Sequence, residues 1–338
     1  MRRARRPDVV VVTGASAGVG RAVAQRFARD GAAVALLARA SPALDAAAAE
    51  VRALGGRALP CAVDVADAAQ VEDAAGRIER ELGPIDVWIN AAMATVFAPV
   101  GEIDAGEFRR ATEVTYLGTV HGSMSALRRM RPRERGCIVQ VGSALAYRAI
   151  PLQSAYCGAK FAIRGFTDAL RVELMHERSR VHVTMVQLSA FNTPQFEWAR
   201  CRLPRRPQPV PPIFQPELAA RAIHWAAHHR RREVCVGFPA VKAILGNKLC
   251  PSLADRLLVR LGYAGQMDDQ PLPPDRPDNL FHAVQADLGT HGRFDDRSRG
   301  DSLQWWLCSH RDTLVKTAGA MLALCLWRRA RRQRPQHH

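Results

Sequence analysis

An alternation of two residue patterns between positions 8 and 237 constrains the fold more strongly than any other feature of this chain. Short apolar runs rich in β-branched residues occur at 8–13, 33–38, 58–63, 85–90, 137–142, 181–188 and 233–236. Stretches with helical periodicity fill most of the gaps, at about 19–30, 42–55, 67–82, 104–130, 154–178 and 216–229. Strands that alternate with helices form parallel sheets covered by helices on both faces. We therefore expect an α/β fold built on a doubly wound parallel sheet of seven strands.

The alternation stops at residue 237, and two further segments follow. Residues 238–302 are expected to hold one or two helices over 240–263 and then a polar stretch rich in Pro, Asp and Gly. Residues 303–338 are first apolar, with two tryptophans, and then basic. The expected organisation is thus an α/β domain over 8–237, a helical and irregular extension over 238–302, and a C-terminal segment over 303–338.

One proline-rich segment, CRLPRRPQPVPPIFQP at 201–216, interrupts the pattern inside the α/β domain. Its prolines exclude a helix and a central strand. Three interpretations stay open: a surface loop, a lid over an active site that follows the sixth strand, or a proline-rich peptide ligand.

Composition excludes several classes of protein. An apolar fraction of 48% over 338 residues excludes a disordered chain. The net charge of +16 comes almost entirely from arginine, and much of it lies in the terminal runs MRRARR and RRARRQR. Because no helix-turn-helix, zinc-finger or aromatic sheet motif accompanies this charge, we expect no nucleic-acid partner. The arginine and alanine bias is typical of a GC-rich bacterial genome.

The cysteines and the N-terminal residues indicate in which cellular compartment the protein is expected. Eight cysteines are scattered without a CxxC pair or a Cys/His cluster, so neither a metal site nor a disulfide framework is expected. Only four apolar residues follow the N-terminal arginines before Thr13, which is too few for a hydrophobic targeting region. The expected location is the cytoplasm.

The turn TGASAGVG at 13–20 joins the first expected strand to the first expected helix. A helix N-terminus presents free N–H groups and a positive dipole end, which suit a pyrophosphate. Glycines let the backbone approach such a ligand without an intervening Cβ. The alternative is a tight turn without a ligand. The turn predicts a dinucleotide site in which the contacting residues are Gly14, Ser16, Gly18, Val19 and Gly20.

Two more strand ends fit a dinucleotide. Arg39 follows the second strand, where an acidic residue would hold a ribose 2′-OH and a basic one accommodates a 2′-phosphate. Arg39 therefore favours NADP over NAD, although a solvated arginine is the plainer interpretation. Asp64 and Val65 follow the third strand, and Asp64 is a candidate acceptor for the adenine amino group or a simple cap of the next turn.

Three residues in the stretch GCIVQVGSALAYRAIPLQSAYCGAK carry candidate chemistry. Ser143 lies at the carboxyl end of an expected strand, where ligands of open α/β sheets bind. Tyr156 and Lys160 are four residues apart on an expected helix and share a face. A lysine ammonium, together with an oxidised nicotinamide, would favour the phenolate and lower the pKa of the tyrosine. Ser143 would then donate a hydrogen bond to the substrate oxygen.

These motifs together resemble the short-chain dehydrogenase/reductases of the TGxxxGxG type. The resemblance covers about 8–237 and depends on TGASAGVG, Asp64-Val65, Asn90-Ala91-Ala92, Ser143 and Tyr156 with Lys160. It implies a seven-stranded Rossmann sheet and hydride transfer to or from a nicotinamide. It also implies that Ser143 polarises the carbonyl, that Tyr156 is the general acid/base, and that Lys160 binds the ribose hydroxyls. Asn90 and Ala91 become cofactor-contacting candidates.

The chain departs from the family pattern at two catalytic positions. Thr115 stands where the family often has the asparagine of a proton relay, so Thr115 is the candidate for that catalytic role. After the sixth strand the usual Pro-Gly is replaced by Ser189-Ala190, and Thr193 is the candidate contact to the nicotinamide carboxamide. The principal hypothesis is an NADP(H)-dependent carbonyl/alcohol oxidoreductase. The alternative is a catalytically weak scaffold or regulator that kept the fold.

The C-terminal segment and the partners leave more than one option. TLVKTAGAMLALCLW at 313–327 is shorter than the roughly 20 apolar residues of a spanning helix. It is expected to dock on the enzyme or a dimer partner, to rest on the inner face of the membrane through Trp305, Trp306 and Trp327, or to be a free tail.

The resemblance also implies an oligomer, because the family is usually dimeric or tetrameric. The expected substrate is a small carbonyl or alcohol, bulky and apolar or acidic, because aromatic residues and arginines mix over 189–215.

Overall fold

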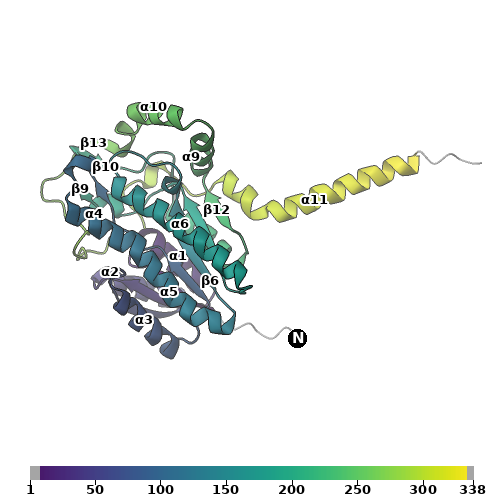
Figure 1. Ribbon diagram of the computed structural model, residues 1–338, viewed down its shortest axis with the longest axis horizontal. Helices are drawn as coiled ribbons and strands as arrows, with labels where there is room; N and C mark the ends of the chain where they lie inside the picture. Colours follow the sequence, from purple (N-terminus) through teal and green to yellow (C-terminus); the bar gives the residue numbers. More distant parts are fainter. Residues whose placement is uncertain (1–7, 333–338) are drawn as a thin grey trace, which may run out of the picture.

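The computed structural model, which describes residues 8–332, contains the expected doubly wound sheet (Figure 1). All seven strands are parallel, in the order β12-β7-β6-β4-β1-β2-β3. Their bounds are β1 Val9–Thr13, β2 Ala33–Ala38, β3 Arg57–Ala62, β4 Val87–Asn90, β6 Cys137–Ser143, β7 His182–Leu188 and β12 Glu233–Val236. The order reverses direction between β1 and β4, and the carboxyl ends of these strands are where an open α/β sheet binds its ligand.

Helices cover both faces of the sheet because its central strands are buried on both sides. In β1, Val10 and Val12 pack with one group of helices, whereas Val9 and Val11 pack with the other. The first group consists of α1 Gly18–Ala28, α2 Pro42–Ala53 and α8 Pro216–His228. The second includes α3 Ala68–Glu81, α5 Gly118–Met130 and α6 Ser154–His176. A strand buried on both faces gives a continuous apolar run rather than an alternating one.

The single helix expected over 104–130 is interrupted. It consists of α4 Ala105–Thr112, a π-helical turn over Glu113–Leu117, and α5. A Cβ on Gly118 would lie 2.6 Å from the side chain of Val65, so the glycine lets α5 pass close to the end of β3. Such π-turns inside helices accompany functional sites because they redirect one residue.

The proline-rich segment contains neither a helix nor a strand of the central sheet, as expected. Instead it contributes short strands to small satellite sheets. β9 Arg200–Cys201 pairs with β5 Val96–Phe97, and β10 Arg205–Pro207 pairs with β13 Met267–Pro271. β11 Ile213–Phe214 lies between β8 Ala190–Phe191 and β14 Ser298–Arg299. The segment thereby ties the C-terminal extension to the α/β domain.

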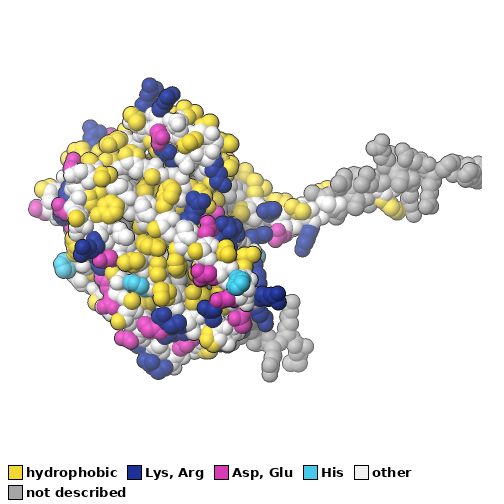
Figure 2. Space-filling view, viewed as in Figure 1, with side chains coloured by type: hydrophobic (Ala, Val, Ile, Leu, Met, Phe, Trp, Pro, Cys, Tyr) yellow, Lys and Arg dark blue, Asp and Glu magenta, His cyan; other side chains and the backbone are white. Residues whose placement is uncertain are grey.

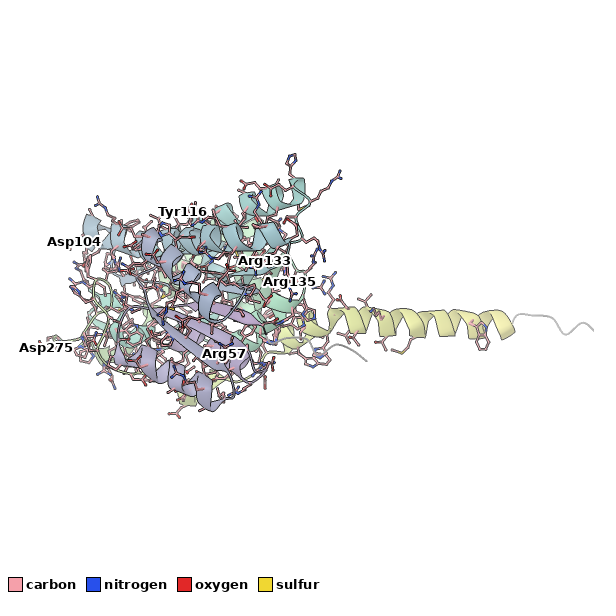
Figure 3. All side chains as sticks on the ribbon, turned by 90° about the horizontal axis from the view of Figure 1, so that it is seen from below. Arg57, Asp104, Tyr116, Arg133, Arg135 and Asp275 are labelled. Carbon is pink, nitrogen blue, oxygen red and sulfur yellow. The ribbon has the colours of Figure 1, made fainter. Side chains whose placement is uncertain are left out.

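The extension begins with two helices, α9 Phe238–Leu249 and α10 Pro251–Leu261, at one end of the molecule (Figure 1). The chain then returns across the body of the protein to the last helix, α11 Leu303–Arg332. Figure 3, a view at right angles to Figure 1, shows charged side chains such as Asp104, Asp275 and Arg135 around the body, and α11 extending away from it.

The two parts of α11 behave differently. Trp305 is buried in the main core, edge-to-face with Trp225 at 5.6 Å between ring centroids, and Gln304 bonds to the backbone of Cys235 and Gly237. The expectation that Trp305 is an interfacial anchor is therefore wrong, whereas Trp306 and Trp327 are exposed. Beyond Asp312 the helix projects from the body (Figure 1). Within residues 8–332, no helix has both the length and the apolar character needed to cross a membrane.

Candidate active site

A cavity of about 1080 Å³ lies at the carboxyl ends of the central strands. Most of the residues singled out in the sequence share its wall. Those that line it are Gly14, Ser16, Gly18, Val19, Gly20, Arg39, Asp64, Val65, Ala91, Ser143, Tyr156, Lys160 and Thr193. One continuous space therefore joins the glycine turn to the serine, tyrosine and lysine.

The glycine turn is shaped by the protein's own packing as well as by space for a ligand. Gly14 has a φ of +68°, and a Cβ there would lie 2.8 Å from the backbone of Ala92. A Cβ on Gly20 would lie 2.2 Å from the carbonyl oxygen of Gly14. Side chains at these two positions would thus clash with the chain itself. Gly18 faces the side chain of Thr193, which brings the loop after β7 against the turn.

A basic group, Arg39, also lines the cavity just after β2, whose Leu37 carbonyl accepts from the N–H of Gly14 in the glycine turn. The Arg39 guanidinium donates to the backbone oxygen of Asn279 through one terminal nitrogen. Its other terminal nitrogen, Nη1, is buried without a hydrogen-bond partner among the described residues. Asp64 pairs with Arg110 and accepts from the backbone N–H of Ala66. A buried guanidinium with unused donor capacity is suited to an anion.

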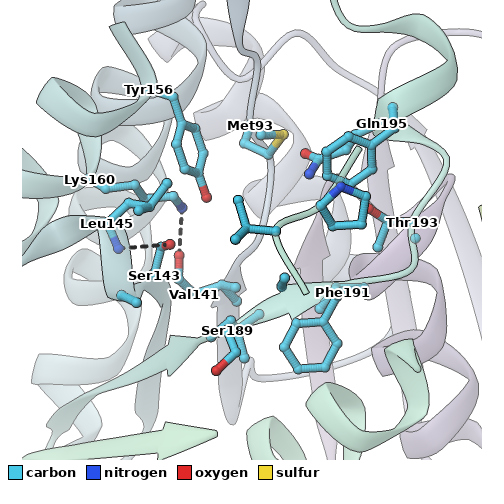
Figure 4. Close-up of a pocket in the computed structure, with 18 of the residues that line it drawn as sticks. Met93, Val141, Ser143, Leu145, Tyr156, Lys160, Ser189, Phe191, Thr193 and Gln195 are labelled. Atoms are coloured by element: carbon cyan, nitrogen blue, oxygen red, sulfur yellow. Dashed lines mark hydrogen bonds between the residues drawn. The ribbon is translucent and has the colours of Figure 1, made fainter. Parts of the chain in front are cut away.

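The candidate catalytic groups meet between β6 and α6 (Figure 4). Ser143 is the last residue of β6, and its hydroxyl oxygen accepts from the backbone N–H of Leu145 at 3.1 Å. The Tyr156 phenol points toward the same space from α6 (Figure 4). Lys160, one turn further along α6, donates to the Val141 backbone oxygen at 2.7 Å and lies 5.4 Å from the Tyr156 ring centroid.

Burial sets the proton affinities of these groups. It raises the pKa of the Tyr156 phenol, and the hydrogen bond with Ser143 opposes that shift. Burial also lowers the pKa of Lys160 to about 8, because the apolar surroundings disfavour the ammonium form. The groups of the chain by themselves thus keep Tyr156 protonated at neutral pH.

The comparisons with known proteins agree with this geometry. The family model for short chain dehydrogenases matches residues 8–200. The uncharacterized oxidoreductase YxnA of Bacillus subtilis (strain 168) is 30% identical over 329 residues, which are 97% of this chain and 91% of the relative. The chain belongs to the short-chain dehydrogenase family.

Relatives whose names state an activity match a smaller part of this chain. The 3-dehydrosphinganine reductase of Danio rerio is 33% identical over 55% of this chain and 57% of its own length. The solved alcohol dehydrogenase from Thermococcus sibiricus, complexed with 5-hydroxy-NADP, has a TM-score of 0.58 and 26% identity. It covers 68% of this chain, and 95% of the solved chain is matched. The residues that the family model matches, 8–200, all lie within the α/β part of the chain.

Two of the expected site residues lie outside the wall of this dehydrogenase's cavity. The Asn90 amide, at the end of β4, is buried on the side of the sheet that α5 covers. There it donates to Ser123 and Gln140 and accepts from the indole of Trp88. The Thr115 hydroxyl donates to the backbone oxygen of Ala94 and accepts from its N–H, both at 2.9 Å. The Thr115 hydroxyl thus fastens the π-turn to Ala94, and its role in a proton relay stays a prediction.

A segment of the extension that was not predicted from the sequence closes one side of the cavity. Residues 276–292, here called the strap, cross the glycine turn and the end of β2. Gly289 accepts from the N–H of Gly18 at 3.2 Å, and Asp287 pairs with the buried Arg21. The residues of the strap that line the cavity are Asn279, Ala283, Val284 and Ala286. Its sequence has no periodicity, so no sequence signal pointed to it.

The rest of the cavity is lined mostly by apolar side chains, beside polar ones such as Arg148, Lys242 and Arg299. Phe196, Trp198 and Phe214 line it, together with Phe238 from α9 and Leu258 from α10. The arginines expected beside these aromatic residues are not part of the lining: the guanidinium groups of Arg200 and Arg202 pair with the buried carboxylate of Glu107. Arg205 and Arg206 are absent from the lining as well, so the expectation is wrong for these four arginines, and Arg148 and Arg299 line the cavity instead.

Proposed function

We propose that this chain is an NADP(H)-dependent oxidoreductase that interconverts a carbonyl and an alcohol through Ser143, Tyr156 and Lys160. The observation that carries the proposal is that these three side chains line one cavity that continues to the glycine turn. Family membership and the NADP-type ligand named for the solved Thermococcus sibiricus relative support it.

The residues present fit a dinucleotide. The N-terminus of α1 lies at the cavity wall and offers N–H groups to a pyrophosphate. Gly14, Ser16, Gly18, Val19 and Gly20 would hold that group. Arg39 would hold the 2′-phosphate with its unpaired nitrogen, Asp64 and Val65 would contact the adenine, and Thr193 would contact the carboxamide. Ala91 would border the cofactor, whereas Asn90 would support that edge from below.

When bound, the nicotinamide supplies or accepts the hydride. The Ser143 hydroxyl donates to the substrate oxygen as negative charge develops there. In the reductive direction the Tyr156 phenol transfers its proton to that oxygen; its raised pKa keeps the phenol protonated in the resting state, so that the proton is available. Lys160 holds the ribose hydroxyls, and solvent that reaches the cavity returns the proton. Because burial raises the pKa of Tyr156, forming the phenolate for alcohol oxidation depends on positive charge brought by the oxidised cofactor.

Replacement of Tyr156 by Phe tests this assignment. It removes the proton donor and keeps the ring, so we expect NADPH affinity to be nearly unchanged and turnover to fall at least about a hundredfold. Tyr147→Phe is a matched control, because the Tyr147 hydroxyl bonds to Glu233 outside the cavity lining. Equal turnover in the Tyr156 variant and the wild type would refute the role.

The engagement of the Thr115 hydroxyl by the backbone of Ala94 supports a second candidate, a catalytically weak scaffold that binds the cofactor. A panel of alcohols with NADP, and of ketones with NADPH, separates the two candidates. Cofactor binding without turnover of any compound would favour the scaffold.

Assembly and location belong to the same proposal. Apolar side chains on α5 and α6, including Met124, Phe161, Val172 and Met175, are exposed. Burial of this face in a homodimer or homotetramer would remove it from water. We place the protein in the cytoplasm, with contact to the inner face of the membrane through the part of α11 that projects beyond Asp312.

A further inference from the structure

Helices α9 and α10 form a hairpin whose outer side is apolar and exposed. Leu249 and Val259 are 79% and 77% exposed, and Leu245 and Leu253 are each more than half exposed. In α10 no residue is buried. Contiguous apolar surface of this kind on a folded domain marks an interaction site.

The charge on the hairpin has one dominant sign. Lys242, Lys248, Arg256 and Arg260 are its basic residues. Its only acidic residue, Asp255, pairs with Arg148 on the body of the protein at 2.5 Å. Figure 2 shows apolar atoms and basic groups side by side at the end of the molecule that Figure 1 assigns to α9 and α10. Leucines beside lysines and arginines complement an anionic lipid surface, which attracts both.

The inner side of the same hairpin is part of the cavity wall. Phe238 and Ala243 of α9, and Leu257, Leu258 and Leu261 of α10, line the space that reaches Ser143 and Tyr156. Phe238 is also 63% exposed, so the apolar lining continues to the protein surface at this point. A molecule with a long apolar chain can therefore pass from the outer face of the hairpin to the catalytic groups along apolar side chains.

We infer that the α9–α10 hairpin rests on an anionic lipid bilayer and that the substrate is an apolar, bilayer-dissolved carbonyl or alcohol, which enters the cavity beside this hairpin. The substrate part of this inference rests on the proposed function, which supplies the carbonyl/alcohol chemistry. The membrane contact is independent of that function.

Vesicle sedimentation with the full-length protein tests the membrane contact. The probes are vesicles of phosphatidylcholine alone and of phosphatidylcholine mixed with phosphatidylserine. The test variant carries L249Q, L253Q and V259Q, three exposed positions outside the cavity lining. The matched control carries V100Q and F108Q, which are 66% and 39% exposed and lie outside the hairpin, the cavity lining and the exposed face of α5 and α6.

We expect the wild type and the control with V100Q and F108Q to bind the phosphatidylserine vesicles, and salt to weaken this binding. The hairpin variant should bind at least about tenfold more weakly, because its apolar contacts are lost. Equal binding by the hairpin variant would overturn the inference. A change in its oligomeric state without vesicles would also overturn it, since the face would then be a protein interface.

The substrate class is tested with two ketones that share a reactive end. One is short and water-soluble, and the other carries a long alkyl chain and is delivered in the vesicles. The hairpin variant should oxidise NADPH with the short ketone at the wild-type rate and with the long one at least about fivefold more slowly. Equal losses on both ketones would overturn the delivery role. No NADPH oxidation with either ketone would count against the proposed function alone, because vesicle binding is measured separately.

Discussion

The contact between Arg21 and Asp287 provides a test of how the strap holds the cofactor cleft closed. The Arg21 side chain is 3% exposed and bonds to Glu50, to the Ser16 backbone oxygen and to both oxygens of Asp287. Asp287 also accepts from the N–H of Gly289, whose own carbonyl accepts from the turn at Gly18. Asp287→Ala therefore removes the ionic link between the strap and α1.

The size of the effect follows from exposure and from the remaining partners. Hydrogen bonds to charged groups contribute about 1.5–3 kcal/mol each when buried, but Asp287 is 36% exposed and water replaces part of its contribution. Glu50 keeps the Arg21 charge paired, so the larger penalty of an isolated buried charge does not arise. We expect a loss of about 2 kcal/mol in strap closure, which corresponds to about 30-fold in the closing equilibrium.

The assay combines NADPH fluorescence titration with hydrogen exchange. The Asp287 variant should release NADPH faster, with a dissociation constant up to about 30-fold higher, and amides of 276–292 should exchange faster without any ligand. Asp275→Ala is the control, because Asp275 is exposed at the surface near the strap (Figure 3). Unchanged exchange and affinity in the Asp287 variant would refute the view that this ion pair holds the strap.

Three further predictions concern other parts of the molecule. Burial lowers the pKa of Lys160 to about 8, so its positive charge is present below that pH and lost above it. NADPH affinity should therefore fall as the pH rises through 8. Titrations of the Lys160→Arg variant across the same pH range should show no such fall. Arg39→Asp should shift preference toward NAD, and an unaltered NADPH affinity would contradict the 2′-phosphate contact. Trp305→Ala should cost about 3–5 kcal/mol in chemical unfolding, whereas Trp306→Ala should cost less than about 0.5 kcal/mol, because Trp305 is 8% exposed and Trp306 is 49% exposed.

Much of the fold was predictable from the sequence because the relevant signals are local. Buried parallel strands are continuous apolar runs, and helices between them have a period of 3.6 residues, so the seven strands and most helix positions agree with the expectation. The glycine turn, Ser143, Tyr156 and Lys160 also come together as the strand ends predict. The break of the fourth helix was not predicted, because the π-turn depends on the bonds between Thr115 and Ala94.

The sequence by itself determined which chemical groups stand at the carboxyl ends of the strands, since the side-chain period of each element and the alternation of elements decide that placement. Only the tertiary structure decided which of the side chains predicted to be functional reach the cavity or the surface. Asn90 and Thr115 are turned into hydrogen bonds with distant neighbours, and Trp305 is withdrawn into the core. The strap reaches Arg21 from a position 266 residues away, through contacts between polar side chains that have no periodicity along the chain. Such contacts arise from three-dimensional packing, so no local pattern in the sequence specifies them.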